Sequence, residues 1–261
     1  MEPTELILLE GTVSAVIYRN EENGYTILRL ESDQEEEDVT VVGTMPGINP
    51  GEGLSVQGQW THHSTYGPQF KAEIVERRMP VGEKAILEYL MSGAVKGVGG
   101  VTARRLFDAF GADVLTVIEE APQRLTEVKG ITPKRAETMH QSLCMQLAMR
   151  RLLDFLAEHG LPLQIGMPLY QRYGDLALTV LRNDPYLLLE DPLYVPFPTV
   201  DQLALALGIA PDASLRLEAG LLHTLSHNLD NGHVFLPYSK LMDAAQRLLS
   251  AQPEDLAQCF A

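Results

Sequence analysis

Residues 95–106, VKGVGGVTARRL, and residues 128–136, VKGITPKRA, contain the same four-residue unit twice. In each copy an apolar residue and a lysine precede a glycine, and a second apolar residue follows it. Each unit is then followed by a helix start, with an alanine at the same offset and with paired cations. Glycine at the third position permits a tight turn that other residues adopt only with strain. The repeat therefore predicts two short helical hairpins.

This pattern matches the helix-hairpin-helix motif, in which an apolar-x-Gly-apolar-Gly turn joins two helices. Such a turn can approach a phosphate closely, and the following helix points unpaired N–H groups and its positive dipole end at the anion. Nearby arginine and lysine side chains add charge-assisted hydrogen bonds. These contacts hold DNA without reading its base sequence. The predicted DNA-binding residues are Lys96, Gly97, Gly99, Gly100, Arg104, Arg105, Lys129, Gly130, Lys134 and Arg135.

The sequence of the turns is compatible with two other interpretations. A Gly-x-Gly before a helix also occurs in dinucleotide-binding turns, but these need a preceding strand and a third glycine, which are absent here. The alternative that both units are only packed turns between helices stays open. If the turns cradle phosphate, Gly97 and Gly99 are expected to need positive φ angles.

The net charge of −15 at pH 7 is unevenly distributed along the chain. Residues 1–80 hold 5 Lys and Arg against 14 Asp and Glu, residues 81–150 hold 9 against 8, and residues 151–261 hold 6 against 13. Only the middle segment has no excess of acidic residues, and its Lys and Arg residues are concentrated beside the two turns. Screening confines the repulsion of distant charge to roughly 8–10 Å. DNA binding is therefore expected, but weak and salt-sensitive.

The first part of the chain predicts β structure. Strands are expected at residues 12–18, 25–31, 39–44, 54–62 and 70–77, separated by Gly-, Pro- and Asn-rich turns. Five short strands suit a small closed barrel of the OB type. Near the last turn lie Trp60, His62, His63, Tyr66 and Phe70. They either stack on bases or, as we favour, Trp60 and Phe70 fill the core while the histidines lie in a solvated loop.

Helical patterns follow from residue 82 onward. Helices are expected at residues 83–91, 102–110 and 113–119, and a long helix starts at Thr132 and Pro133 and ends near Gly160. Further helices are expected at residues 163–172, 175–181, 199–207, 212–229 and 239–250, with a short β segment at 233–236. The predicted domains are an OB-like barrel (1–80), a tandem helix-hairpin-helix domain (81–160) and a mostly helical domain (161–261). The fold class is α+β, multidomain.

A longer echo links the second and third regions. Residues 110–117, FGADVLTV, recur as residues 173–180, YGDLALTV, and both copies continue to a proline, Pro122 and Pro185. The hairpin of this further copy falls at residues 194–197, YVPF, which contain no glycine and no cation. This degenerate hairpin is expected to pack rather than to bind DNA.

The whole series resembles the N-terminal region of the long-form RecD-like ATP-dependent DNA helicases. Besides the barrel and the hairpins, the resemblance rests on NDPYLLLED (183–191), FPTVDQLALALGI (197–209) and NGHVFLP (231–237). It implies a role in DNA repair and recombination, ahead of a motor that moves 5′ to 3′ on single-stranded DNA. It also carries the hairpin glycines and cations over onto Gly97, Gly99, Lys96, Arg104, Arg105, Gly130, Lys134 and Arg135.

Two departures from that family pattern matter. The family shows Gly-Ile-Gly-Phe where this chain has residues 194–197, YVPF. No Gly-Lys-Ser/Thr occurs, so ATP and Mg²⁺ are implied only for the motor of the full-length relative, and no cofactor is expected in this chain. Whether the protein acts as an enzyme therefore stays open, and no catalytic residue is predicted. The final helical pattern favours the N-terminal piece of a longer helicase over a motorless relative.

Other features narrow the expected setting and partners. Cys144 and Cys259 fit no metal or redox spacing, and no signal peptide or membrane segment is visible, which predicts a reduced cytoplasmic protein. His223 and His227 are four residues apart but lack the glutamate and third ligand of a zinc site, so no metal is expected. The expected partner is DNA, either single-stranded or at a single/double-strand junction. Two alternatives remain: a RuvA-like junction-binding protein, and a protein-docking module that uses the acidic barrel.

Overall fold

The computed structural model describes residues 6–32, 34–230 and 235–260. The chain divides into two compact units, with the division between Tyr170 and Gln171. The first unit contains all five strands and the helices up to α4 (Pro133–Glu158), and the second is helical in its described part. The domain boundaries expected at residues 80 and 160 stay a prediction.

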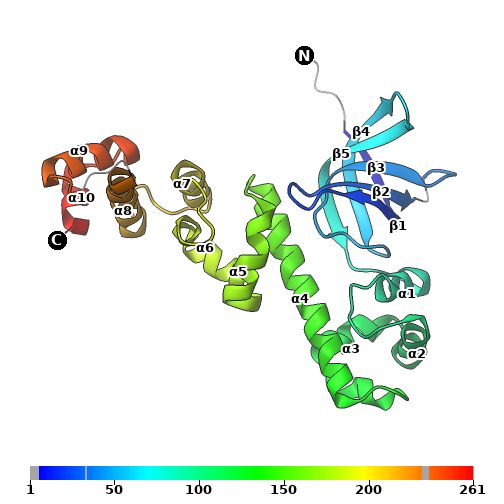
Figure 1. The fold of residues 1–261 in the computed structure, drawn as a ribbon. Helices are drawn as coiled ribbons and strands as arrows, with labels where there is room; N and C mark the ends of the chain where they lie inside the picture. Colours follow the sequence, from blue (N-terminus) through cyan, green and yellow to red (C-terminus); the bar gives the residue numbers. More distant parts are fainter. Residues whose placement is uncertain (1–5, 33, 231–234, 261) are drawn as a thin grey trace. The chain divides into compact units, whose positions relative to one another are not determined.

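The first unit begins with a closed β-barrel (blue to cyan in Figure 1). Its strands are β1 (Ile7–Arg19), β2 (Tyr25–Glu31), β3 (Val39–Thr44), β4 (Gly53–His63) and β5 (Gly67–Arg78). The order around the barrel is β1-β2-β3-β5-β4, and only β3 and β5 pair in parallel. Alternate residues point inward, so that Val13, Leu28, Val41, Val56 and Phe70 are fully buried. The five predicted strands and their closure into an OB-like barrel are confirmed.

Helices follow the barrel within the same unit. They are α1 (Glu83–Met91), α2 (Gly100–Phe110), η1 (Gly111–Asp113), α3 (Val114–Glu120), η2 (Pro122–Glu127) and α4 (Pro133–Glu158). Their shared core contains the fully buried Leu90, Leu106, Ile118, Leu125 and Met139. The long helix α4 begins where Thr132 and Pro133 predict it, because Thr132 caps it by accepting the backbone N–H of Arg135 at 3.3 Å.

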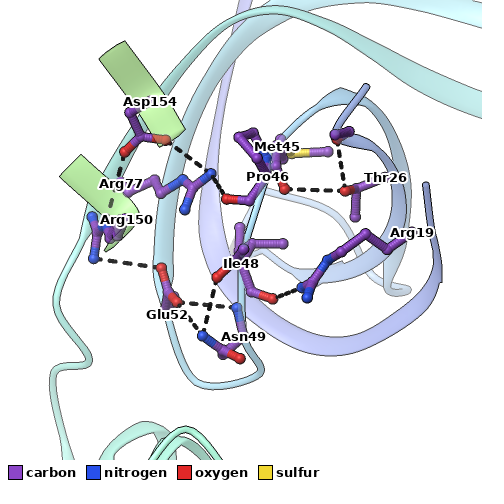
Figure 2. A network of polar contacts seen from close by, with 12 residues as sticks. Arg19, Thr26, Met45, Pro46, Ile48, Asn49, Glu52, Arg77, Arg150 and Asp154 are labelled. Atoms are coloured by element: carbon purple, nitrogen blue, oxygen red, sulfur yellow. Dashed lines mark hydrogen bonds and ion pairs between the residues drawn. The ribbon is translucent and has the colours of Figure 1, made fainter. Parts of the chain in front are cut away.

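A polar network joins the barrel to α4 (Figure 2). Arg77 on β5, whose side chain is 4% exposed, forms an ion pair with Asp154 on α4 at 3.0 Å and also donates to the carbonyl of Pro46. Arg150 on α4 approaches the buried carboxylate of Glu52 at 3.5 Å. Burial lowers the pKa of Arg77 and raises that of Asp154, so each charge depends on its partner. Removing Asp154 would leave the buried guanidinium of Arg77 without its ion-pair partner.

Gly51 makes a second junction between the barrel and the helices. Its φ is +87°, and a Cβ there would lie 2.2 Å from the carbonyl oxygen of Ala85 and 2.6 Å from the backbone nitrogen of Tyr89. Only glycine therefore lets the barrel loop approach α1 this closely. Together with the polar network, this contact places the barrel and the hairpin helices in one unit.

The second unit follows from α5 (Gly166–Tyr173), which spans the division and is preceded by η3 (Leu163–Ile165). Its elements are η4 (Gly174–Leu176), α6 (Ala177–Asn183), η5 (Pro185–Leu189), α7 (Phe197–Ala206), α8 (Ser214–Asp230), α9 (Tyr238–Leu249) and α10 (Pro253–Phe260). A buried ion pair joins α7 to α8, with Arg216 donating twice to Asp201 at 2.8 Å. Of the predicted β segment, residues 233 and 234 lie outside the described residues and 235 and 236 are not in a strand.

The predicted echo between the two regions is present in the backbone. Gly111 and Gly174 both have a φ of 57°, and the residues before them, Phe110 and Tyr173, have φ of −121° in both copies. Each glycine opens a short 3₁₀ turn, then a seven-residue helix, α3 or α6, and then a second 3₁₀ turn that starts at a proline. The chain therefore uses the same supersecondary unit twice.

Candidate nucleic-acid interface

Two turns in the first unit share one backbone geometry. Turn 1 (residues 95–99) joins α1 to α2, and turn 2 (residues 128–132) joins η2 to α4. Gly97 and Gly130 occupy the third position of each and have φ of 84° and 92°. In both turns the next N–H closes back on the first carbonyl, Val98 to Val95 at 3.3 Å and Ile131 to Val128 at 3.1 Å. The two predicted hairpins are therefore present, and each needs glycine at its third position.

The residue that caps the following helix is extended in both turns. Gly99 has φ −110° and ψ 173°, and Thr132 has φ −85° and ψ 159°. Our expectation that Gly99 needs a positive φ is therefore wrong, because any residue can adopt this conformation. A Cβ on Gly99 would have no heavy atom within 4 Å, so that it would face open space. The backbone conformation of Gly99 therefore does not require glycine, and the missing side chain leaves the start of α2 uncovered.

Access differs between the two helix ends. The first three N–H groups of a helix lack a partner inside it. In α2 these belong to Gly100, Val101 and Thr102, and no acidic residue lies in the first turn. In α4 the first residue is a proline, which has no N–H, and the N–H of Arg135 is taken by Thr132. Turn 1 therefore offers more free donors to an anion than turn 2.

Arg135 joins the two turns directly. Its Nε and Nη2 donate to the carbonyl of Gly97 at 3.1 and 2.8 Å, and its Nη1 donates to the carbonyl of Gly130 at 3.1 Å. Its Nη2 also donates to the hydroxyl of Thr102 at 2.9 Å. A guanidinium has five N–H donors, so most of them are used inside the protein. The contact with Gly97 spans 38 positions along the chain, and no local pattern could have revealed it.

The remaining predicted cations divide into two groups. Arg104 pairs with Glu83, and Arg105 donates to the carbonyl of Lys129 at 3.4 Å. Both side chains of the Arg104–Glu83 pair are more than half exposed, and such a pair is held only weakly in water. Among the predicted cations, Lys96, Lys129 and Lys134 form the second group: their side chains are exposed and have no partner in the described residues.

The sequence did not reveal that Ser142 holds turn 1 by hydrogen bonds. Ser142 on α4 accepts the backbone N–H of Lys96 at 2.9 Å and donates to the carbonyl of Ala94 at 3.2 Å. Nothing in the residues around position 142 marks this role. Ser142 orients turn 1 because α4 packs beneath it, which only the tertiary structure decides.

A third turn in the second unit follows the same path with other residues. Tyr194 has a positive φ of 43° and occupies the position of Gly97 and Gly130, directly before Val195 and the cap residue Pro196. Val195 is buried, as is Phe197 at the start of α7, so this turn packs as expected. The ring of Tyr194, however, is 69% exposed.

The aromatic residues near the end of β4 divide between core and surface. Phe70 is fully buried, whereas Trp60 is 42% exposed and meets the edge of Phe70 with ring centroids 5.5 Å apart. The assignment of Trp60 to the core is therefore wrong, because β4 pairs with β1 only as far as Gly58 and Trp60 lies in the part of the β4–β5 hairpin beyond it. His63 and Tyr66 are exposed, and their ring centroids are 4.9 Å apart.

Within the described residues, no three His, Cys, Asp or Glu side chains gather where they could hold a metal ion. His223 instead stacks on Phe197 with ring centroids 4.7 Å apart, and His227 lies 6.4 Å from it. No helix in the described ranges is both long and apolar enough to span a membrane.

The fold and the paired turns define a class of protein: an OB-type barrel combined with tandem helix-hairpin-helix elements. Residues 6–80 match the family model of the OB-fold domain of the ATP-dependent DNA helicase YrrC. Residues 87–143 match the SAM-like helix-hairpin-helix tandem, and residues 145–235 match the helix-hairpin-helix domain of the ATP-dependent RecD2 DNA helicase.

The sequence of one relative is consistent with these domain matches. The ATP-dependent RecD2 DNA helicase of Deinococcus radiodurans is 33% identical over 245 residues, which cover 91% of this chain and 34% of that protein. The chain therefore spans about a third of the length of that relative. In its OB-fold and helix-hairpin-helix domains the chain resembles the N-terminal region of the RecD-like helicases.

Proposed function

We propose that this chain binds the sugar–phosphate backbone of DNA without sequence preference, through turns 1 and 2, and guides the strand to a helicase motor that moves 5′ to 3′. The observation that carries the proposal is the matched pair of glycine turns, each followed by a helix and flanked by unpaired lysines, with free N–H groups at the start of α2. Contacts of this kind favour any phosphate and distinguish no base. The RecD-like domain matches support the same conclusion.

The geometry favours different roles for the predicted residues. Lys96, Lys129 and Lys134 are the direct phosphate ligands, since their side chains are exposed and without a partner in the described residues. Gly99 and Gly100 give the phosphate access to the N–H groups of α2. Arg104 and Arg105 contact DNA after their weak bonds to Glu83 and to the carbonyl of Lys129 break.

Arg135 is a positioning residue in this proposal. Its donors are already committed to Gly97, Gly130 and Thr102, so it fixes the separation of the two turns instead of reaching for phosphate. Both turns can then engage one DNA backbone in a fixed register. This arrangement lowers the entropy that would otherwise be lost when DNA binds.

The barrel contributes a second contact in our proposal. Trp60, His63 and Tyr66 are exposed on the β4–β5 hairpin, where they can stack on unpaired bases. Residues 53–72 contain no Asp or Glu, although residues 1–80 hold 14. The hairpin is thus the part of an acidic barrel that a nucleic acid can approach. Because Trp60 is the single tryptophan of the chain, its fluorescence should be quenched when single-stranded DNA binds and should remain unchanged with duplex DNA.

Nucleotide chemistry lies outside this chain in our proposal. The sequence contains no Gly-Lys-Ser/Thr, so its residues do not fit a phosphate-binding loop for ATP and Mg²⁺. We assign both to the motor of a longer, cytoplasmic RecD-like protein that acts in DNA repair and recombination. The present chain supplies binding and orientation alone.

DNA-binding measurements test the proposal. Fluorescence anisotropy would compare single-stranded, duplex and forked DNA over a series of salt concentrations. The triple change of Lys96, Lys129 and Lys134 to alanine should weaken binding to all sequences alike and flatten the salt slope by about 0.7–0.9 per lost contact. The exposed Lys240 and Arg247 on α9 provide the control, and their change to alanine should have a smaller effect. Equal losses in both variants would refute the assignment of the interface to turns 1 and 2.

A further inference from the structure

A groove of about 620 Å³ lies in the second unit, between η5, the third turn, α7 and α8. Its apolar walls include Tyr194, Phe197 and Leu222, and His223 lies against Phe197 with the two rings nearly parallel at 13°. Burial lowers the pKa of His223, which favours its neutral form, and its stacking on Phe197 makes it part of the aromatic floor of the groove. A volume of this size is typical of sites that accept a small ligand or a few side chains.

A hydrogen-bond network around Asp201 connects the elements that line the groove. The hydroxyl of Tyr186 on η5 donates to Asp201 on α7 at 2.7 Å, and Arg216 on α8 binds the same carboxylate. This network satisfies the charge of Asp201 and joins the three elements that line the groove. The groove is therefore a preformed feature of the unit.

Tyr194 occupies a position that costs backbone strain. Its φ of 43° is the conformation that the two sister turns reach with glycine. A tyrosine in that conformation is disfavoured by the contact of its Cβ with the following carbonyl. Core packing does not explain the choice, because the ring is mostly exposed and lines the groove. Strained residues that persist in a fold are concentrated at binding sites.

The charged residues that line the groove are all acidic. Asp184, Glu190 and Glu218 line it, and no lysine or arginine does. Glu190 is paired with Arg172 at 3.1 Å, and residues 151–261 as a whole hold 13 acidic against 6 basic residues. A phosphate backbone would be repelled here, whereas a cation would be attracted. The third turn therefore has the opposite charge preference to turns 1 and 2.

We propose that this groove docks a segment of another protein in which an apolar or aromatic side chain is flanked by arginine or lysine. The apolar side chain would insert against Phe197 and Leu222 beneath the ring of Tyr194, and the flanking cations would meet Asp184 and Glu218. Charge complementarity selects this occupant over an oligonucleotide or an acidic peptide. The inference does not rest on DNA binding by turns 1 and 2, because it concerns another unit and other residues.

The test uses the full chain and a fluorescein-labelled, blocked peptide in which leucine and tryptophan alternate with arginine. A second peptide replaces each arginine with glutamate. Fluorescence anisotropy should show binding of the basic peptide and none of the acidic one. Glu218→Lys should weaken binding of the basic peptide about tenfold. The matched control is Glu254→Lys on α10, which changes the net charge equally at an exposed position outside the groove and should change affinity by less than about twofold.

Two substitutions at position 194 separate docking from fold stability. Tyr194→Gly relieves the strained φ, and Tyr194→Asn keeps a residue that tolerates it. Each should weaken peptide binding by about fivefold or more without lowering the midpoint of thermal unfolding. Equal losses in the Glu218 and Glu254 variants, parent-like binding by both Tyr194 variants, or no binding of the basic peptide to the parent would each overturn the proposal. The proposal would also be overturned if the Tyr194 and Glu218 variants changed the affinity for an oligonucleotide and left the affinity for the basic peptide unchanged.

Discussion

Substitution of Gly99 by valine separates the conformation of turn 1 from its access to DNA. The residue lies at φ −110° and ψ 173°, a region that valine prefers, and a Cβ would find no heavy atom within 4 Å. The free energy of unfolding should therefore fall by less than about 1 kcal/mol, through the poorer helix cap that valine makes. The valine side chain would nevertheless stand in front of the free N–H groups of α2 and hold a phosphate away from them.

We expect Gly99→Val to reduce DNA affinity about tenfold, which corresponds to about 1.4 kcal/mol. Fluorescence anisotropy would measure the affinity, and circular dichroism during heating would measure stability. Two further variants bracket the result. Gly97→Val should lose both affinity and stability, because the φ of 84° at Gly97 excludes a β-branched residue. Pro196→Gly, at the equivalent position of the third turn, should leave affinity unchanged. A folded Gly99→Val protein with parental affinity would refute phosphate binding at turn 1.

Three further outcomes are expected. Purified chain should show no DNA-stimulated ATP hydrolysis above that of a mock preparation, since it lacks a phosphate-binding loop; activity that co-purifies with the chain would contradict this. Changing Arg104 and Arg105 to glutamate should weaken DNA binding more than changing Arg172 and Arg182, and equal effects in anisotropy would reverse our ranking of the turns. Burial raises the pKa of Tyr89 to about 12, so its contribution to stability, about 2–3 kcal/mol, is present below pH 10 and is lost as pH rises through 12. Thermal unfolding of Tyr89→Phe should depend less on pH over that interval, and an unchanged dependence would show that this hydroxyl stays protonated or is already solvated.

Under our proposal, the pairing of turns 1 and 2 accounts for DNA binding by an acidic chain. The unpaired cations are few, but Arg135 holds the two turns at one separation and Ser142 orients turn 1 on α4. The site thus depends on backbone N–H groups and geometry more than on bulk charge. Such a site tolerates a net charge of −15 when screening limits the reach of the distant carboxylates.

Several features of this protein follow from the sequence by itself, because they depend on local backbone preferences. Gly97 and Gly130 predict turns with positive φ, and Thr132 with Pro133 predicts the start of α4. Short runs rich in Val, Ile, Thr and aromatic residues between turn signals predict the five strands, because these residues favour the extended backbone. The 110–117 and 173–180 echo predicts a repeated unit, which both copies then adopt.

Tertiary structure decided everything that depends on residues far apart in the chain. Arg135, predicted as a phosphate ligand, meets carbonyls on both turns because α4 passes beside turn 1. Trp60 lies partly exposed because the hairpin runs beyond the barrel, and Gly99 is extended because it caps α2 instead of closing the turn. Such contacts arise from the packing of elements, whereas a sequence pattern reports only neighbours along one element.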